Sequence, residues 1–261
     1  MIKFFRNIRQ TMIKDNRITK YLLYAVGEII LVVIGILIAL QINNWNEKRV
    51  IREETELRLS KLIEDLVNDQ NQLKNMQYEY SFNFHALQYL FKMSNIEPYL
   101  PDLDNIVVPS YQNTPFWKRT IPKTYDKEFI QLAFKLSQQV GIPKSSKNTY
   151  DELKSTGRFS FISKDSLRDQ INTYYQRWEW LFDPNIDEFK KRWLYSLDKI
   201  GIMESNPFTI EKPLSILTNN PEYAAILRRL TREIGWYAMS SKWLLEVNTN
   251  LVKSIKAEIA Q

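Results

Sequence analysis

Residues 21–42 read YLLYAVGEIILVVIGILIALQI and form an apolar run that contains one charged residue, Glu28. An α-helix rises about 1.5 Å per residue, so a helix of this length can cross a hydrocarbon core of about 30 Å. We therefore predict that residues 21–42 form a transmembrane helix and that the lipid bilayer is a partner of the chain.

A cleaved secretory signal peptide is the competing interpretation of this run. The apolar region of a signal peptide usually spans about 7–15 residues and precedes a small-residue, A-x-A-like cleavage site. The run found here is longer, and Ala39-Leu40-Gln41 offers no such site. The pattern therefore favours an uncleaved signal-anchor.

Aromatic residues flank the run, with Tyr21 and Tyr24 at one end and Trp45 at the other. Such amphipathic rings are typical anchors at the membrane–water interface. Six Lys or Arg residues lie within residues 1–20, and five lie within residues 43–62. Because cytoplasmic flanks carry the excess of Lys and Arg, the pattern predicts a bacterial inner-membrane protein with a cytoplasmic N-terminus and a periplasmic C-terminal domain.

Residues 1–20 have a pattern of their own, because Met1, Phe4, Phe5, Ile8 and Met12 recur at helical spacing between basic residues. A basic amphipathic helix on the cytoplasmic leaflet fits this pattern, and so does a solvated basic tail. The tail also supplies most of the formal charge of +6. That charge is therefore a topology signal, and we expect no nucleic-acid partner.

Glu28, Val32, Gly35 and Ala39 follow the +4, +3, +4 spacing of one helix face. Gly35 and Ala39 form a small-xxx-small pair that permits close helix approach, and an ionisable residue within a membrane is costly without a partner. One hypothesis is a contact face for a homodimer or for a partner membrane protein. The alternative is a tolerated acid near the membrane boundary.

The extramembrane part, residues 43–261, is predicted to be an all-α bundle with long first and last helices. The first helix should run from about Asn46 to Ser94, continuous with the membrane span, since this stretch contains no Pro or Gly. Its apolar positions recur at helical spacing. They are Leu59, Leu62, Leu66, Leu73, Met76, Tyr80, Phe84, Leu87 and Phe91.

The last helix should begin at Pro221, with Asn220 as its N-cap. A seam of alternating +4 and +3 spacing follows, with two polar interruptions, Ser241 and Asn248. The seam consists of Tyr223, Leu227, Leu230, Ile234, Tyr237, Ser241, Leu244, Asn248, Leu251 and Ile255. It is typical either of a helix–helix interface whose register the polar residues fix or, as we favour, of a core-facing stripe within one domain.

Shorter helices are predicted between the two long ones. One should span residues 126–140, and one should span residues 149–156 with Thr149 and Glu152 as a capping box and Gly157 as its stop. A third, capped by Ser163, should end near Phe182, and a fourth should run from Asp183-Pro184 to about Leu197.

Several of these stretches look like a known family. The segment GEIILVVIGILIALQ at residues 27–41, followed by INNWNE at residues 42–47, resembles a large family of uncharacterised single-pass membrane proteins of Bacteroidota that is known only as a domain of unknown function. YDELKSTG at residues 150–157, Leu167-Arg168 and Tyr174-Tyr175 resemble the same family. The resemblance implies a membrane anchor and a helical extracytoplasmic domain, and it implies no catalytic residue.

The chain offers few residues for catalysis. It has no cysteine and one histidine, His85, so thiolate chemistry and His-rich zinc sites are not expected. Asp151, Glu152, Asp165 and Asp169 cluster in the sequence around Gly157, where capping acids and surface ion pairs are the plainer interpretation.

We therefore predict no catalytic residue, no metal site and no cofactor. The favoured function is a non-catalytic binding, sensing or scaffold module of the cell envelope. The alternative is a membrane-anchored, carboxylate-dependent enzyme that acts on envelope glycans or lipids.

Overall fold

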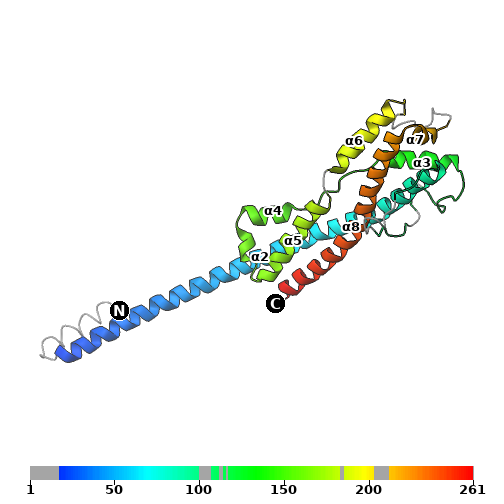
Figure 1. The fold of residues 1–261 in the computed structure, drawn as a ribbon. Helices are drawn as coiled ribbons and strands as arrows, with labels where there is room; N and C mark the ends of the chain where they lie inside the picture. The colour runs from blue at the N-terminus through cyan, green and yellow to red at the C-terminus, as the bar shows by residue number, and fades with distance from the viewer. Residues whose placement is uncertain are drawn as a thin grey trace. The chain divides into compact units, whose positions relative to one another are not determined.

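The computed structural model describes residues 18–99, 107–111, 114–115, 117–182, 185–202 and 212–260. Over these residues the chain is helical and contains no strand, which confirms the predicted all-α class (Figure 1). The α-helices are α2 (Ile18–Met93), α3 (Lys127–Gln138), α4 (Asn148–Ser155), α5 (Asp165–Leu181), α6 (Asn185–Asp198), α7 (Ser215–Asn219) and α8 (Pro221–Ile259), and η2 (Arg158–Phe161) is a 3₁₀ turn.

The chain divides into two compact units, residues 1–57 and residues 58–261. The predicted boundaries at residues 20/21 and 42/43 concern the membrane, so they stay predictions. As predicted, the apolar run and the first amphipathic stretch belong to one helix, α2. This helix ends where Asn95 adopts a left-handed conformation (φ 52°) and the N–H of Ile96 donates to the carbonyl of Phe91 at 3.0 Å.

The second unit has a closed hydrophobic core built on the two long helices. Every apolar position predicted for α2 is buried there. In α8 every position of the predicted seam is buried except Tyr223, which is partly buried and packs against the core. The favoured interpretation of the seam, a core-facing stripe within one domain, is therefore confirmed.

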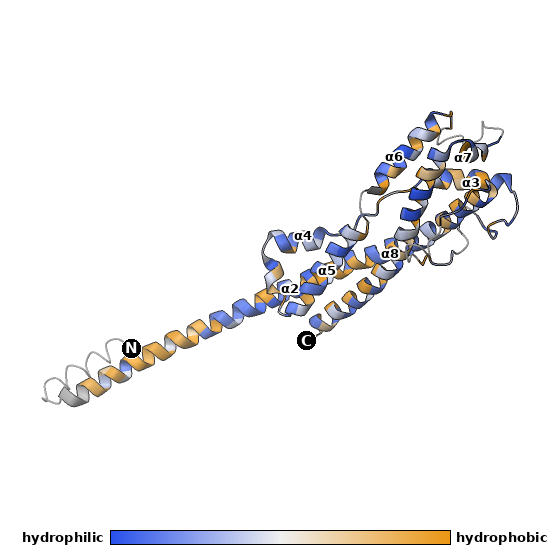
Figure 2. Cartoon of the chain, in the orientation of Figure 1, coloured by the Kyte–Doolittle hydropathy of each residue, from blue (hydrophilic) through white to orange (hydrophobic). Residues whose placement is uncertain are grey.

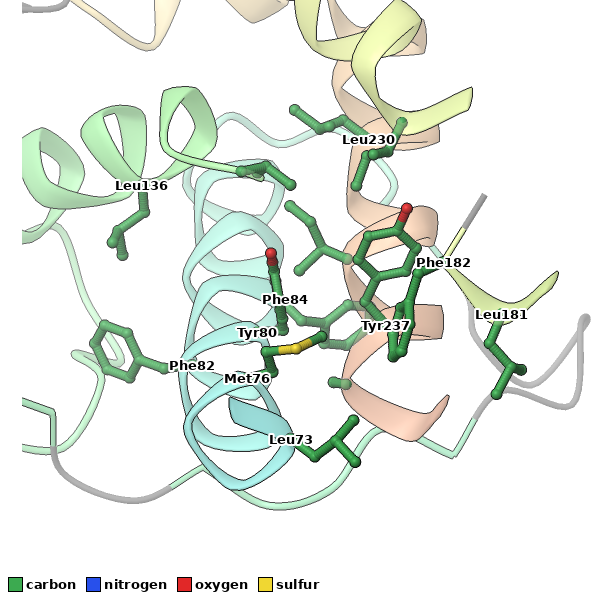
Figure 3. Packing of buried hydrophobic residues seen from close by; sticks show 14 of the residues in the cluster. Leu73, Met76, Tyr80, Phe82, Phe84, Leu136, Leu181, Phe182, Leu230 and Tyr237 are labelled. Carbon is green, nitrogen blue, oxygen red and sulfur yellow. The ribbon is translucent and has the colours of Figure 1, made fainter. Parts of the chain in front are cut away.

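Aromatic side chains join α2, α5 and α8 in the middle of this core (Figure 3). The rings of Tyr80 on α2 and Tyr237 on α8 meet edge to face with centroids 5.7 Å apart. Phe182, directly after α5, meets the same Tyr237 ring at 5.2 Å. On another side of α2, the ring of Phe82 lies 6.2 Å from that of Phe129 on α3. Edge-to-face pairs of this kind add to the stabilisation from burial.

The predicted helix starts are only partly correct. The capping box at Thr149 is wrong, because α4 begins at Asn148 and the N–H of Thr149 donates to Asp65 Oδ2 on α2 at 3.0 Å. Ser163 does not cap α5; its hydroxyl donates to Glu258 Oε1 at 2.6 Å, and the helix begins at Asp165. In both cases the residue binds a side chain from a distant helix and the predicted local cap does not form.

The other predicted boundaries lie close to the observed ones. Pro221 does begin α8, but the side chain of Asn220 donates to the carbonyl of Ile216 at 2.9 Å instead of capping α8. Gly157 follows α4 with φ 71°, a conformation that glycine adopts at little cost. The predicted start at Asp183-Pro184 lies outside the described residues, and α6 is described from Asn185.

Gly235 permits the close approach of α8 to α2. A Cβ atom added there would lie 3.0 Å from two ring carbons of Phe84 and 3.1 Å from Val108 Cγ2. Phe84 is itself buried in the core, and its ring meets that of Tyr99 edge to face. The small residue is therefore a packing requirement of this helix pair.

Gly235→Val should lower the free energy of unfolding by about 1–3 kcal/mol, the usual cost of overpacking a core. Thermal unfolding of the full-length protein in detergent, followed by tryptophan fluorescence, measures the change. Gly141→Val is the matched control, since a Cβ at Gly141 meets no atom within 4 Å. Equal unfolding midpoints for the two variants would contradict the close-packing argument.

Candidate functional site

The first candidate site is the apolar surface of α2 within residues 1–57. By length and composition, α2 is the one described helix that could cross a membrane. The protein buries no part of the most apolar stretch of α2. Figure 2 shows the orange of hydrophobic residues along this part of the helix. Contiguous apolar patches larger than a few hundred Å² are uncommon on soluble monomers. The surface is therefore compatible with a membrane anchor.

The predicted contact face lies on this surface. Glu28 is partly exposed, and Val32, Gly35 and Ala39 are exposed. A Cβ atom added at Gly35 would meet nothing within 4 Å, so no neighbouring group within the chain requires a glycine there. The helix thus presents these four residues along one side. Their contact with a second helix stays a prediction.

Two of the three predicted interface anchors can be described. Trp45 is 65% exposed, and the guanidinium carbon of Arg49 lies 5.9 Å from the centroid of its ring. Tyr24 is partly exposed. The side chain of Tyr21 and the predicted amphipathic helix at the N-terminus lie outside the described residues, apart from the backbone of residues 18–20 in α2.

Two of the four acids that cluster around Gly157 in the sequence form separate ion pairs in the structure. Glu152 pairs with Arg58 of α2, and this hydrogen bond holds the pKa of the Glu152 carboxyl below its usual value. Asp165 pairs with Arg168 one turn along α5. Across the described residues there is no group of three or more His, Asp or Glu side chains that could hold a metal ion.

A second candidate site is a buried polar network that the sequence analysis did not identify. Asp69 of α2 is 0% exposed. Its Oδ1 accepts the N–H of Ser146 at 2.6 Å, and its Oδ2 accepts the hydroxyl of Tyr174 on α5 at 2.9 Å. Asn248 Nδ2 of α8 donates to the same Tyr174 oxygen at 2.9 Å and to the carbonyl of Leu66 at 3.1 Å.

Of the two polar residues in the predicted α8 seam, only Asn248 joins different helices through its side chain. The Ser241 hydroxyl donates to the carbonyl of Tyr237 within α8 itself, at 2.6 Å. Asn248 instead binds groups of α2 and α5, as described above. A polar group can fix the register of packed helices when the alternative is to leave it buried and unpaired. The register role proposed for Ser241 is therefore not supported by its contacts.

The network also holds the segment between α3 and α4, residues 139–147. Tyr80 donates its hydroxyl to the carbonyl of Gly141 at 2.5 Å, and Trp178 Nε1 donates to the carbonyl of Pro143 at 3.3 Å. The hydroxyl of Tyr175 donates to the carbonyl of Ser146 at 3.2 Å. Side chains of α2 and α5 therefore provide hydrogen bonds for backbone groups that belong to no helix.

The sequence did contain a signal for Asp69. The apolar stripe of α2 advances by three and four residues, and its one long step lies between Leu66 and Leu73. Asp69 occupies the missing position, three residues after Leu66 and four before Leu73. An acid on a core-facing stripe implies a buried carboxylate with hydrogen-bond partners. The identity of those partners depends on the tertiary structure.

Burial raises the pKa of the Asp69 carboxyl from 3.8 to about 6, while the hydrogen bonds from Ser146 and Tyr174 partly oppose this shift. A carboxyl whose pKa is higher in the folded state binds its proton more tightly there than in the unfolded chain. Its contribution to stability is therefore fully present below about pH 4 and is lost as the pH rises through about 6. The change corresponds to about 3 kcal/mol.

Comparison with known proteins gives one match. A family model described as "Family of unknown function (DUF6090)" matches residues 28–84. The matched stretch contains most of the apolar run and the part of α2 that carries Asp69. No curated protein and no solved structure matches the chain significantly. The match supports the resemblance to a domain of unknown function, while single-pass relatives in Bacteroidota stay an expectation.

Asp69→Asn should change the pH dependence of stability, because asparagine does not ionise. The free energy of unfolding of this variant, relative to the unsubstituted protein, should rise by about 3 kcal/mol between pH 3 and pH 7. Chemical unfolding of the full-length protein in detergent at several pH values measures the difference. Glu64→Gln, an exposed acid on the same helix, is the control and should show a smaller change. A constant difference for Asp69→Asn would contradict a perturbed carboxyl.

Proposed function

We propose that the chain is a single-pass membrane-anchored protein of the bacterial cell envelope whose helical C-terminal domain is a non-catalytic binding, sensing or scaffold module. The observation that carries the proposal is the exposed apolar surface of α2 in residues 1–57, in a chain whose second unit closes its own hydrophobic core. The apolar surface needs a covering that the chain itself does not supply.

Lipid is the covering that best fits the length and composition of this surface. Transfer of apolar area from water contributes about 25 cal/mol per Å², and large side chains such as Leu31 and Leu37 are more than half exposed. The aromatic and basic residues at Trp45 and Arg49 match the composition of a membrane–water boundary. A protein partner would have to surround α2 completely to cover the same apolar surface.

The carboxylate-enzyme alternative receives no support from the acids that motivated it. Glu152 and Asp165 are engaged in ion pairs, and Asp151 and Asp169 are exposed on the surface of the domain. General acid–base chemistry favours carboxyl groups with raised pKa values inside a cleft. Among the described residues, the carboxyl with the raised pKa is that of Asp69, and it is enclosed within the core.

The proposed topology places the N-terminus in the cytoplasm and residues 43–261 in the periplasm, because Lys and Arg are slightly more frequent before the span than after it. The absence of cysteine from the chain makes this testable with single thiols. Lys14→Cys reports on the tail, and Asp169→Cys reports on an exposed position of α5.

In intact spheroplasts, a membrane-impermeant maleimide should label Asp169→Cys and should label Lys14→Cys only after permeabilisation. The unsubstituted protein is the background control. The reverse labelling pattern would overturn the orientation. Release of the protein from vesicles by alkaline carbonate would overturn the membrane anchor itself.

The contact face of the span generates a separate prediction. If Gly35 allows close approach of a second helix, Gly35→Ile should reduce association in membranes several-fold, and Glu28→Leu should also reduce it. Gly27→Ile is the matched control, because Gly27 lies about 100° around the helix from Glu28. Energy transfer between labelled copies in lipid vesicles measures self-association, and a two-hybrid assay in membranes detects a different partner. Unchanged association in both substituted proteins would contradict a role for this face.

A further inference from the structure

A cavity of about 730 Å³ lies in the second unit, near the carboxyl end of α2. Its floor is formed by α2 residues that include His85, Gln88 and Lys92. The walls come from Tyr99, which follows α2, and from Tyr111 and Lys123 in the connection to α3. Ligand pockets of proteins usually have volumes of about 300–1,000 Å³ and contain aromatic surfaces with a few polar groups.

Hydrogen bonds fix the walls of this cavity. Gln88 Nε2 donates to the carbonyl of Tyr99 at 2.6 Å, and the Tyr111 hydroxyl accepts the N–H of Ile121 at 3.3 Å. The hydroxyl of Tyr89 bridges two backbone groups just before α3, donating to a carbonyl and accepting an N–H, both at 2.9 Å. The cavity is therefore largely pre-formed, which reduces the entropy cost of binding a ligand.

Gln88, one of the residues that line the cavity, has a side-chain acceptor without a donor among the described residues. Gln88 Oε1 is buried and has no hydrogen-bond partner among the described residues. The other end of the same amide is held by the carbonyl of Tyr99, so the oxygen stays in place. A buried, unpaired acceptor is costly, and a ligand that supplies a donor removes that cost.

Among the described residues, the charged groups that line the cavity are two lysines, Lys92 and Lys123, and one acid, Glu97. Neither lysine forms an ion pair with a described carboxylate. His85 contributes no charge near pH 7, because burial lowers its pKa, although a hydrogen bond to the carbonyl of Pro109 opposes this shift. The two ammonium groups therefore outnumber the carboxylate, which favours an anionic ligand over a cationic one.

Aromatic rings supply part of the remaining surface, beside the side chains of Ile96, Pro98, Ile121 and Pro122. The ring of His85 lies 5.2 Å from that of Tyr111, tilted by 55°. Tyr99 is buried beside Phe84, with ring centroids 6.4 Å apart. Flat apolar ligands stack on surfaces of this kind and gain from the area that they bury.

We propose that this cavity binds a small anionic molecule with a flat apolar body, its acid group near Lys92 and Lys123 and a hydrogen-bond donor at Gln88 Oε1. The inference deepens the proposed function of a binding module by assigning a ligand class to its C-terminal domain. It does not depend on the orientation of the domain across the membrane.

The probe for this proposal is 6-hydroxy-2-naphthoate, which combines a phenol donor, a flat body and a carboxylate. The full-length protein in lipid nanodiscs should bind it in isothermal titration calorimetry, with empty nanodiscs subtracted. The neutral 6-hydroxy-2-naphthamide should bind about tenfold more weakly, since it forms no charge-assisted contact with the lysines. The cationic 6-(aminomethyl)-2-naphthol should bind more weakly still.

Substitutions locate the contacts. The double variant Lys92→Gln, Lys123→Gln should remove the preference for carboxylate over amide, while Lys242→Gln, Lys253→Gln, with two exposed lysines of α8, should keep it. Gln88→Met should weaken binding of the phenol, but it should have little effect on 6-methoxy-2-naphthoate, which lacks the donor. A merely structural role of Gln88 would affect both probes equally.

Absence of binding by the unsubstituted protein at millimolar probe, or tighter binding of the amine than of the carboxylate, would overturn the proposal. Equal loss of both naphthoates in Gln88→Met would overturn the role of its oxygen. These outcomes are distinct from failure of the membrane anchor, which carbonate extraction and thiol labelling test without any ligand.

Discussion

The hydroxyl of Tyr174 stands between the carboxylate of Asp69 and the amide of Asn248, and so connects three helices of the second unit in one chain of hydrogen bonds. Asn248 also binds the backbone of α2 at Leu66. These groups are enclosed by apolar side chains, where an unpaired polar atom would be costly. A shift of α8 along α2 would separate these partners, so the network restricts the helices to one register more strictly than the surrounding leucines do.

The apolar contacts supply a different part of the stability. Leu62, Leu66 and Leu73 on α2 and Leu227, Leu230 and Leu244 on α8 are fully buried. Burial of such side chains contributes about 1.5–3 kcal/mol each, but it is non-directional. Hydrophobic burial therefore drives the two long helices together, and the polar network, with the close contact at Gly235, selects how they meet.

The long helices were predictable because their evidence is local and repeated. The stripes of α2 and α8 extend over many turns, and the helix starts at Pro221 and near Asp126 have ordinary sequence signals. The prediction was wrong at Thr149 and Ser163, whose sequence motifs predicted local helix caps. Asp65 and Glu258, distant in the sequence, bind these residues instead. A single sequence contains no record of which distant residue will come within hydrogen-bonding distance.

The candidate sites also differ in whether local sequence spacing could reveal them. The apolar face at Glu28 could be found from spacing alone, because all its members lie on one helix. The cavity beside His85 could not, since its walls come from three stretches of chain whose approach depends on the fold. The ring contacts of His85 and its hydrogen bond to the Pro109 carbonyl are typical of a structural residue, and His85 also lines the cavity.

The connection between α3 and α4 has one further consequence. Surface connections usually tolerate insertions and deletions, because few of their backbone groups depend on a particular neighbour. Here backbone groups of Gly141, Pro143 and Ser146 each form a hydrogen bond with a particular side chain of α2 or α5. Adding or removing one residue would displace every later group from its partner. The length of this connection is therefore as constrained as the helices it joins, and variation in related chains should be substitution without change of length.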